Sequence, residues 1–353
     1  MKNKDIFTFR DAEKQAGPVA FSTMLKPAGS ACNLDCGYCY YLDKAAQYGG
    51  RQAVMADDLL ELYIRQYIEA NEVPVVTFCW HGGEPLLLGR DFYRRAVALQ
   101  RKYAAGKRIE NTLQTNGTLV DEAWCELFAE NGFLVGLSLD GPEDIHDAFR
   151  RTKGGRPTFA RVMRTVGMFR RTGVEYNTLS VVNRACEGRG AEIYRFFRDT
   201  VGSRYMQFLP AVEHVVDRAG LHRPLIVSPE TQGARPAEWS VTAEGYGKFL
   251  CDIFDEWVVS DVGQCFVQLF DATLAQWCGV QPGVCSMGET CGDALVVEHN
   301  GDVYSCDHFV YPEYLLGNIR ETPLAEIYRS RRRIDFGLAK RNALPAECLR
   351  CRY

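Results

Sequence analysis

The amino-acid sequence predicts an α/β protein: a parallel sheet of β/α units, either open or barrel-shaped, followed by a small cysteine-rich α+β domain. Two observations predict this class. Over the first 210 residues, short runs of strand-forming residues alternate with longer stretches of helical periodicity, which is typical of a parallel sheet. Beyond these residues the alternation stops, and the chain becomes rich in loops and cysteines.

The predicted strands are short runs rich in β-branched and aromatic residues. In chain order they are Val19–Leu25, Val75–Trp80, Ile109–Thr115, Leu134–Leu139, Glu175–Val182 and Tyr205–Leu209. One helical pattern lies between each strand and the next. These patterns cover Ala56–Ala70, Asp91–Tyr103, Asp121–Asn131, Thr158–Thr172 and Ala191–Val201. The order of the elements therefore gives successive β/α units.

A polar or turn-forming motif directly follows each predicted strand. These motifs are the first cysteine segment, Gly82–Pro85, Thr115–Thr118, Asp140–Pro142, Asn183 and Pro210. In parallel β/α barrels the carboxyl ends of the strands form the active face. We therefore expect the six motifs to meet at one edge of the sheet and to form the functional site.

The sequence indicates two folded parts joined by a linker. We expect residues 1–213 to form the β/α part, and residues 214–240, which carry several prolines and no period, to form a linker or long loop. Residues 241–353 would form the second part. Its predicted elements are a helix over 242–260, strands near Ala294–His299 and Val303–Ser305, and a hairpin turn at Asn300–Gly301.

Composition and charge exclude several classes of function. The 353-residue chain has a net charge of −4 and a pI near 6.0, which gives no whole-protein electrostatic case for binding nucleic acid. No apolar run approaches the ~20 residues of a membrane helix, and the polar N-terminus lacks the apolar core of a secretory signal. We therefore expect a cytoplasmic protein without a membrane or nucleic-acid partner.

Fourteen cysteines stand out in the composition. Because cytosolic thiols are kept reduced, so many cysteines favour metal binding over disulfides. Cys32, Cys36 and Cys39 form a C-x3-C-x2-C pattern, and three soft thiolates in one short segment fit one metal cluster. A structural zinc site needs four ligands, and no fourth Cys or His lies nearby. An incomplete zinc site and three unrelated buried thiols are the alternatives.

The segment CNLDCGYCYY resembles the signature of the radical S-adenosylmethionine (SAM) enzymes. The resemblance implies a partial (β/α)6 barrel and a 4Fe–4S cluster on Cys32, Cys36 and Cys39, whose open iron chelates the amino and carboxylate groups of SAM. It also implies that an electron from the cluster cleaves the sulfonium and releases a 5′-deoxyadenosyl radical. Tyr38, before the third cysteine, matches a position near the adenine in that family.

Further positions match residues that bind SAM in that family. The resemblance places Gly82, Gly83 and Glu84, from the GGEP motif of WHGGEPLL, at the SAM ammonium. It places Ser138 and Arg150 at the SAM carboxylate and ribose, and Met206 against the adenosine. Without the resemblance they would be interpreted as a Gly-Gly turn, a strand-end hydroxyl, a solvated charge and a core methionine.

A second group of cysteines lies in the C-terminal third. Its members are Cys285, Cys291, Cys306, Cys348 and Cys351. The spacings C-x9-G-x4-C and C-x2-C resemble the SPASM auxiliary-cluster domain, which implies up to two further 4Fe–4S clusters; a zinc ribbon is the alternative. Because the later cysteines of the pattern are absent, we expect a SPASM-type domain that is incomplete at its C-terminus. Its first three cysteines would serve one cluster and its last two the other.

Over nearly its whole length the chain resembles the anaerobic sulfatase-maturating enzymes. The segments that carry this resemblance are WHGGEPLL, LQTNGTL, SLDGP, YMQFLPAVE, YGKFLCDIFDEWVVSDVG and YSCDHFVYPEYLLGNI. It implies oxidation of a Cys or Ser side chain of a sulfatase to Cα-formylglycine, started by hydrogen abstraction by the 5′-deoxyadenosyl radical. Asp307 matches the general base of that family. The positions that match residues facing the peptide or SAM are Tyr41, His81 and Gln207.

The resemblance also implies two partners, an unfolded or nascent sulfatase polypeptide as the substrate and a flavodoxin or ferredoxin as the electron donor. It further implies that the enzyme is a monomer. Two other functions stay open. One is a different SPASM maturase, which forms thioether or carbon–carbon crosslinks in ribosomal peptides and often carries an N-terminal recognition domain. The roughly 20 residues before the first predicted strand are too few for such a domain. The other is a non-catalytic zinc-binding interaction protein.

Overall fold

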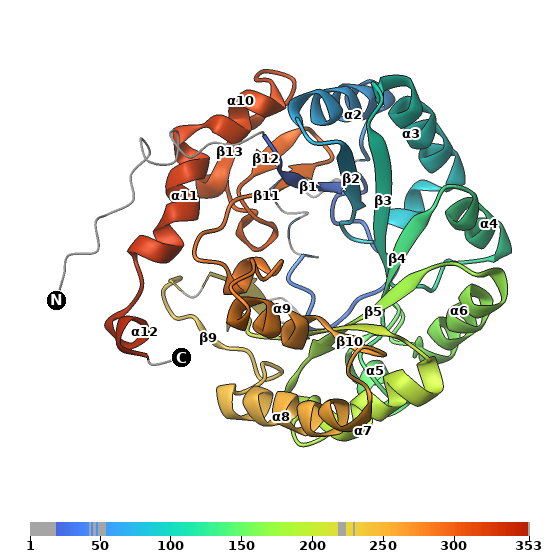
Figure 1. Cartoon of the computed structure of the whole chain (residues 1–353), viewed down its shortest axis with the longest axis vertical. Coiled ribbons are helices and arrows are strands. Elements are labelled where there is room, and N and C mark those ends of the chain that lie inside the picture. Colours follow the sequence, from blue (N-terminus) through green and yellow to red (C-terminus); the bar gives the residue numbers. More distant parts are fainter. Residues whose placement is uncertain are drawn as a thin grey trace.

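The computed structural model describes residues 19–41, 44, 47–48, 54–217, 224–228 and 230–351. Figure 1 shows a large sheet that curves around the middle of the molecule, with helices along its outer side. Most neighbouring strands of this sheet run in parallel. The predicted α/β class with a parallel sheet is therefore confirmed.

Six parallel strands form most of the sheet. They are β1 (Ser22–Lys26), β2 (Val75–Trp80), β3 (Arg108–Thr115), β4 (Phe133–Ser138), β5 (Tyr176–Val182) and β6 (Tyr205–Pro210). Each strand pairs with the next in the chain, in parallel. The β2 bounds are those the sequence predicts, and the other strands differ from the prediction by a few residues at their ends. Consecutive parallel pairing puts all six carboxyl ends at one edge.

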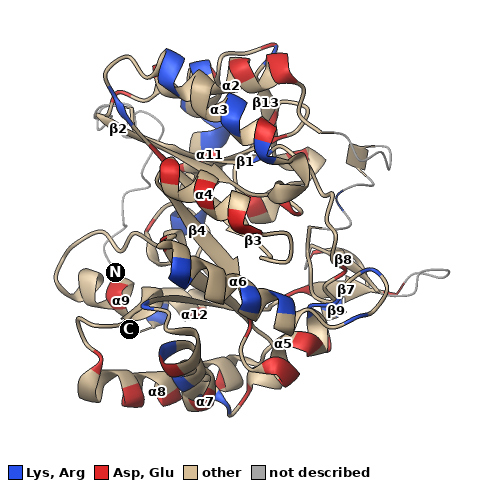
Figure 2. Cartoon of the chain, turned by 90° about the vertical axis from the view of Figure 1, so that its right-hand side faces the viewer, with Lys and Arg blue, Asp and Glu red and all other residues tan. Residues whose placement is uncertain are grey.

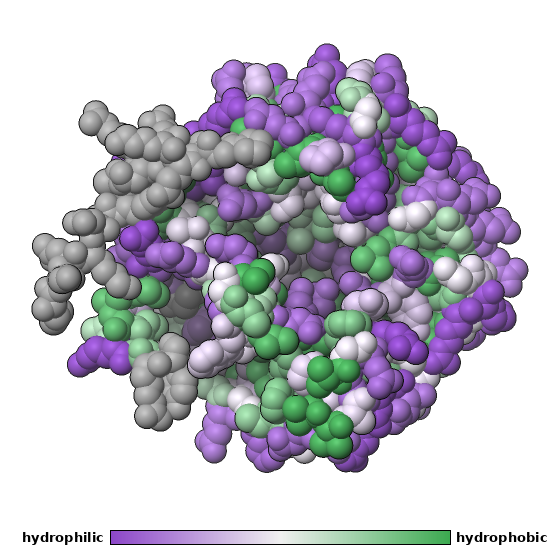
Figure 3. Space-filling view, in the orientation of Figure 1, coloured by the Kyte–Doolittle hydropathy of each residue, from purple (hydrophilic) through white to green (hydrophobic). Residues whose placement is uncertain are grey.

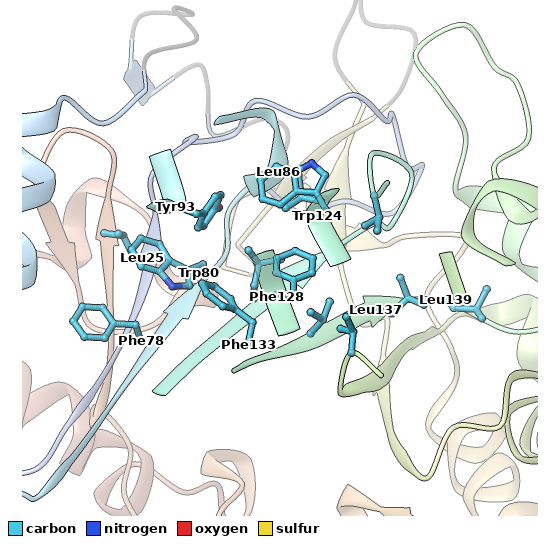
Figure 4. Close-up of a cluster of buried hydrophobic side chains, with 14 of the residues drawn as sticks. Leu25, Phe78, Trp80, Leu86, Tyr93, Trp124, Phe128, Phe133, Leu137 and Leu139 are labelled. Carbon is cyan, nitrogen blue, oxygen red and sulfur yellow. The ribbon is translucent and has the colours of Figure 1, made fainter. Parts of the chain in front are cut away.

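The helices between these strands cover the outer side of the sheet (Figure 1). They are α2 (Asp57–Ala70), α3 (Arg90–Tyr103), α4 (Glu122–Glu130), α6 (Phe159–Thr172) and α7 (Gly190–Arg195). Apolar residues of the helices and strands interdigitate between the two layers. Figure 4 shows Trp80 of β2, Phe128 of α4 and Phe133 of β4 within this cluster, and each is at most 3% exposed. Each buried aromatic ring stabilises this layer by about 1.5–3 kcal/mol.

Two features differ from the helical pattern that the sequence predicts. A further helix, α5 (Glu143–Phe149), lies between β4 and α6, and its two turns are too short to show a clear period. The helix predicted over 191–201 is divided: α7 ends at Arg195, and Phe196–Val201 form a π-helical segment. Such short or irregular turns depend on tertiary contacts more than on local periodicity.

Between residues 214 and 240, the described residues contain more structure than the linker or long loop that the sequence predicts. The short strands β7 (His214–Val216), β8 (Leu225–Val227) and β9 (Arg235–Pro236) form a small antiparallel sheet in the order β8-β7-β9. Val215, in the central strand, is fully buried. Strands of two or three residues are too short to produce an alternating pattern, so this sheet has no signal in the sequence.

The C-terminal part extends the large sheet on both sides. Its elements are α8 (Ala243–Ser260), β10 (Phe266–Val267), α9 (Gln268–Trp277), β11 (Ala294–Glu298), β12 (Asp302–Tyr304), β13 (Leu315–Asn318), α10 (Leu324–Arg329), α11 (Arg331–Asn342) and α12 (Ala346–Arg350). β10 pairs with β6 and β11 pairs with β1, both in parallel. The order in the described sheet is therefore β10-β6-β5-β4-β3-β2-β1-β11-β12-β13. The predicted hairpin is present, with Gly301 at φ 93° in its turn.

The distribution of charged residues on the surface is consistent with the small net charge of the chain. Figure 2 shows basic and acidic residues interspersed over the outer helices. Figure 3 shows that the face seen in Figure 1 is hollowed near the centre of the ring.

Among the described helices, none is long and apolar enough to span a bilayer.

Candidate active site

The loop after β1 carries the first three cysteines and is fixed by the last residue of α5 and the segment that follows this helix. The backbone amide of Asp35 donates to the Arg151 carbonyl at 2.8 Å, and the amide of Gly37 donates to the Phe149 carbonyl at 3.1 Å. These bonds hold the loop across the carboxyl edge of the sheet, against the element that follows β4. The helix α5 therefore helps to position the cysteines.

Cys32, Cys36 and Cys39 lie close together on this loop. Burial raises the pKa of the Cys36 thiol to about 12, and the neighbouring sulfurs of Cys39 and Cys32 add to this rise. Cys32 Sγ accepts hydrogen bonds from the amide of Leu34 (3.4 Å) and from Asn116 Nδ2 (3.8 Å). Buried thiolates are costly unless a cation holds them, and amide donors to sulfur are usual around iron–sulfur clusters. These three residues fit the cluster that the sequence predicts.

The two glycines of WHGGEPLL let the loop after β2 pack directly on the cysteine loop. The Gly83 amide donates to the Gly29 carbonyl at 2.8 Å, and the Glu84 amide donates to the Ala31 carbonyl at 2.7 Å. A Cβ atom at Gly83 would lie 2.1 Å from the Ala31 oxygen, and Gly82 has φ of +117°. Larger residues at these positions would push the two loops apart.

Glu84 joins the ends of β2 and β3. Its buried carboxylate accepts hydrogen bonds from Thr115 Oγ1 (2.8 Å), the Asn116 amide (2.8 Å) and the Leu86 amide (3.0 Å). Burial raises the pKa of Glu84 to about 7, although these hydrogen bonds favour the charged form. A buried carboxyl group of this kind gains from a nearby cation, and the SAM ammonium expected here is such a cation.

Asp140, two residues after β4, lies in a motif that the sequence places at this edge, but the sequence did not assign it a role of its own. Its fully buried carboxylate accepts hydrogen bonds from the Tyr38 hydroxyl and the Val181 amide (3.1 Å), and pairs with Arg150 Nε at 3.0 Å. The Arg150 guanidinium also lies 5.6 Å from the centre of the Tyr38 ring. Asp140 therefore ties the cysteine loop to two strands, and its only sequence signal was its place in the SLDGP motif.

Three further candidates lie on the strands themselves. Ser138 ends β4, and its Oγ accepts a hydrogen bond from Gln114 Nε2 at 2.9 Å. Met206 on β6 is only 1% exposed and packs in the main hydrophobic core, so its side chain offers almost no surface to a ligand. Because side chains alternate along a strand, the next residue, Gln207, points to the opposite face of the sheet from Met206. Gln207 is half-buried.

A second polar group lies where β1, β2 and the loop after β12 meet. Asp307 forms an ion pair with Lys26 and accepts a hydrogen bond from the Tyr40 hydroxyl. Burial opposes ionisation of Asp307, but Lys26, His81 and the Tyr40 hydroxyl together hold its pKa well below its usual range. Burial also lowers the pKa of His81 to about 4. Asp307 is therefore a carboxylate at neutral pH, and its side chain is 18% exposed.

The two tyrosines of the cysteine segment have different contacts. Tyr41 is buried, and its hydroxyl lies 2.7 Å from each carboxylate oxygen of Glu298 on β11. Its ring centre lies 3.6 Å from Lys26 Nζ. Tyr40 contacts the Asp307 carboxylate and stacks on His308 at 5.5 Å. In this structure Tyr40, which the sequence did not single out, is the tyrosine that touches Asp307.

Three cysteines of the C-terminal group also lie near one another. Burial raises the pKa of Cys306 to about 11, and the sulfurs of Cys285 and Cys291 add to this rise. Lys340 Nζ of α11 donates to the Cys285 carbonyl at 2.7 Å, and the Cys291 amide donates to the Gly337 carbonyl at 3.2 Å. Helix α11 therefore supports this loop, and the three sulfurs fit a second cluster beside Asp307.

Cys348 and Cys351 lie on α12 and at its end, where both are exposed. Within the described ranges, no hydrogen bond or ion pair connects them to Cys285, Cys291 or Cys306. No three His, Cys, Asp or Glu side chains of the described chain are arranged to hold a single metal ion.

Replacing Asp140 by Asn should weaken SAM binding, because Arg150 and Tyr38 would lose the charge that orients them. A hydrogen bond to a charged group contributes ~1.5–3 kcal/mol, so the KM for SAM should rise roughly tenfold or more. Formation of 5′-deoxyadenosine at varied SAM concentration measures this. Asp144→Asn, which removes a surface ion pair with Arg189, is the matched control and should leave KM unchanged. An unchanged KM in D140N would contradict the assigned role.

Acid should destabilise the fold through His146. This residue is fully buried on α5, and burial lowers its pKa from 6.5 to about 4. The unfolded chain therefore takes up a proton at higher pH than the folded chain, so stability is complete above pH 6.5 and falls as the pH approaches 4. The loss is roughly 3 kcal/mol. Urea unfolding at pH 7 and pH 4 measures it, and an equally steep loss in His146→Gln would show that another group is responsible.

Comparison with known proteins agrees with this geometry. A model of the radical SAM superfamily matches residues 27–184, and a model of the SPASM iron–sulfur cluster-binding domain matches residues 285–352. The first region contains Cys32, Cys36 and Cys39, and the second contains all five C-terminal cysteines. SAM and iron–sulfur clusters are therefore the cofactors of this protein.

The family of this chain follows from its similarity to individual proteins. A serine-type anaerobic sulfatase-maturating enzyme of Bacteroides thetaiotaomicron is 48% identical over 94% of this chain and 80% of its own length. A cysteine-type enzyme of Clostridium perfringens is 32% identical over 94% and 86%. The solved structure of native anSMEcpe with bound AdoMet and the Cp18Cys peptide matches with a TM-score of 0.82 and 31% identity, over 94% of this chain and 86% of that chain. This chain belongs to the family of anaerobic sulfatase-maturating enzymes.

Proposed function

We propose that this protein is a SAM-dependent peptidyl oxidase that converts an active-site Ser or Cys of a sulfatase polypeptide to Cα-formylglycine. The names of the most similar relatives support this substrate. The observation that carries the proposal is the Asp307 carboxylate, which lies beside the second cysteine group and keeps one edge exposed. A general base must be ionised and within reach of the proton that it accepts, and Asp307 meets the first condition.

The cofactor sites divide between the two cysteine groups. Cys32, Cys36 and Cys39 would hold the cluster that binds SAM, with Glu84 toward the SAM ammonium. Ser138 and Arg150 would contact its carboxylate and ribose, with Arg150 oriented by Asp140. When bound, these groups supply the radical that removes one hydrogen from the target Cβ.

The second cysteine group would supply an electron acceptor. Cys285, Cys291 and Cys306 would hold one auxiliary 4Fe–4S cluster, and Cys348 and Cys351 would contribute to another. Asp307 would accept the proton that the carbon radical loses, and the group held by these cysteines would supply the acceptor for one electron, which gives an aldehyde or thioaldehyde. Asp307 lies next to Cys306, and this closeness supports the release of the proton and the electron at the same place.

The remaining expectations belong to the same proposal. We place the radical SAM region at residues 1–213 and the SPASM-type region at 241–353, although β11 joins the two in one sheet. The substrate would be an unfolded or nascent sulfatase in the cytoplasm, the electron donor a flavodoxin or ferredoxin, and the enzyme a monomer. Higher identity to the serine-type relatives than to the cysteine-type ones supports a serine target.

Anaerobic incubation of the protein with SAM, a reductant and a sulfatase-derived peptide tests the proposal. We expect the serine peptide to lose two hydrogens, measured by mass spectrometry, with 5′-deoxyadenosine as the co-product. Asp307→Asn should still cleave SAM but should lower aldehyde formation by about 10²-fold or more, because a general base contributes 10²–10⁴-fold. Cys36→Ala, which removes a cluster ligand, is the control that should abolish both products.

Two results would contradict the proposal. Full aldehyde yield from D307N would remove Asp307 as the base. No mass change with either the serine or the cysteine peptide, while SAM is cleaved normally, would favour a maturase that crosslinks other peptides.

A further inference from the structure

Lys26 is the fully buried lysine of the large sheet, and no motif in the sequence drew attention to it. It is the last residue of β1 and has 0% exposure. Transfer of an ammonium group out of water is costly unless a partner of opposite charge compensates it. A lysine retained at such a position therefore has a specific partner, and the contacts of Lys26 identify it.

The partner of Lys26 is one oxygen of the Asp307 carboxylate. Lys26 Nζ pairs with Asp307 Oδ1, while the Tyr40 hydroxyl donates to Oδ2. One carboxylate oxygen is thus bound by the last residue of β1 and the other by a residue of the loop that follows it. The Asp307 side chain cannot rotate about its last bond without breaking one of these contacts.

The ammonium group is itself held in place from the other side. Its nitrogen lies 3.6 Å from the centre of the Tyr41 ring, a distance suited to a cation–π contact. Tyr41 in turn donates to both oxygens of Glu298 at 2.7 Å. Glu298 is fully buried and stands opposite Lys26 in the β1–β11 register. A chain of fixed contacts therefore runs from Glu298 through Tyr41 and Lys26 to Asp307.

We propose that Lys26 is a positioning residue that fixes the orientation of the Asp307 carboxylate toward the substrate. This inference rests on the proposed function, because it assigns Lys26 a task in the step after SAM cleavage. It also gives Tyr41 and Glu298 a role in that step: they hold the ammonium group rather than the peptide. SAM binding and cleavage use other residues and should proceed without Lys26.

The ratio of formylglycine to 5′-deoxyadenosine tests this directly. Lys26→Met keeps the length of the side chain and removes the charge, so SAM cleavage should continue while the ratio falls tenfold or more. Lys26→Arg keeps the charge with an altered shape and should give a ratio between those of K26M and the wild type. Lys107→Met is the matched control, because Lys107 is a half-buried lysine that donates to the Ile68 and Asn71 carbonyls at the amino end of β3, away from Asp307. Its ratio should equal that of the wild type.

A double variant separates positioning from a general structural role. If Lys26 acts through Asp307, K26M/D307N should have the same ratio as D307N alone, because the same interaction is already lost. A merely structural role would lower the ratio of the double variant further. If K26M fails to bind its clusters, judged by iron content, the same comparison is made with K26R and K26R/D307N.

The results separate this inference from the proposed function. A wild-type protein that leaves every sulfatase peptide unchanged would overturn the proposed function. A wild-type protein that makes formylglycine, together with a K26M ratio equal to the wild-type ratio, would overturn the inference alone. A double variant whose ratio falls below that of D307N would also overturn it.

Discussion

The active face depends on one constraint: a carboxylate that is buried must receive hydrogen bonds or an ion pair. Four side chains at this edge meet the constraint with donors from other elements. They are Glu84 after β2, Asp140 after β4, Glu298 at the end of β11 and Asp307 after β12. Each one therefore fixes the distance between two segments that are far apart in the sequence. The glycines of the loop after β2 add to this by allowing direct backbone contact with the cysteine loop.

The same constraint joins the two cysteine regions. Parallel pairing of β1 with β11 brings the first cysteine loop beside the loop that carries Cys306. The Lys26–Asp307 and Tyr41–Glu298 contacts then cross between the two regions. Lys44 Nζ crosses as well, with a hydrogen bond of 2.8 Å to the Val310 carbonyl. The first cysteine loop, Asp307 and the loop that carries Cys306 are consequently parts of one continuous framework of contacts.

Much of the fold could be predicted from the sequence, because strands of six to eight residues between amphipathic helices produce clear periods. The β2 strand and helix α6 are examples, at Val75–Trp80 and Phe159–Thr172. The strands of residues 214–240 are too short for a period, and α5 has only two turns. The cysteine spacings and the GGEP motif were readable because the chemistry requires fixed residue types at fixed separations.

The contacts within the site were harder to predict. Whether Tyr40 or Tyr41 touches Asp307 depends on side-chain direction in an irregular loop, which has no period. Met206 matches a family position but faces the core, because alternation on β6 turns it toward the helices. Lys26 gave no signal and Asp140 only its place in the SLDGP motif, since a single charged residue is usually exposed and only the three-dimensional pairing shows it to be buried.

Mössbauer spectroscopy of protein reconstituted anaerobically with ⁵⁷Fe, recorded with and without SAM, tests whether the first cysteine loop holds a cluster with an open iron. Three cysteine thiolates on the loop after β1 should leave one iron of a 4Fe–4S cluster without a protein sulfur ligand. SAM should shift the spectrum of a single iron site in this cluster, and Cys36→Ala should remove the shift. A cluster whose iron sites are all unaffected by SAM, or protein that takes up no iron on this loop, would contradict it.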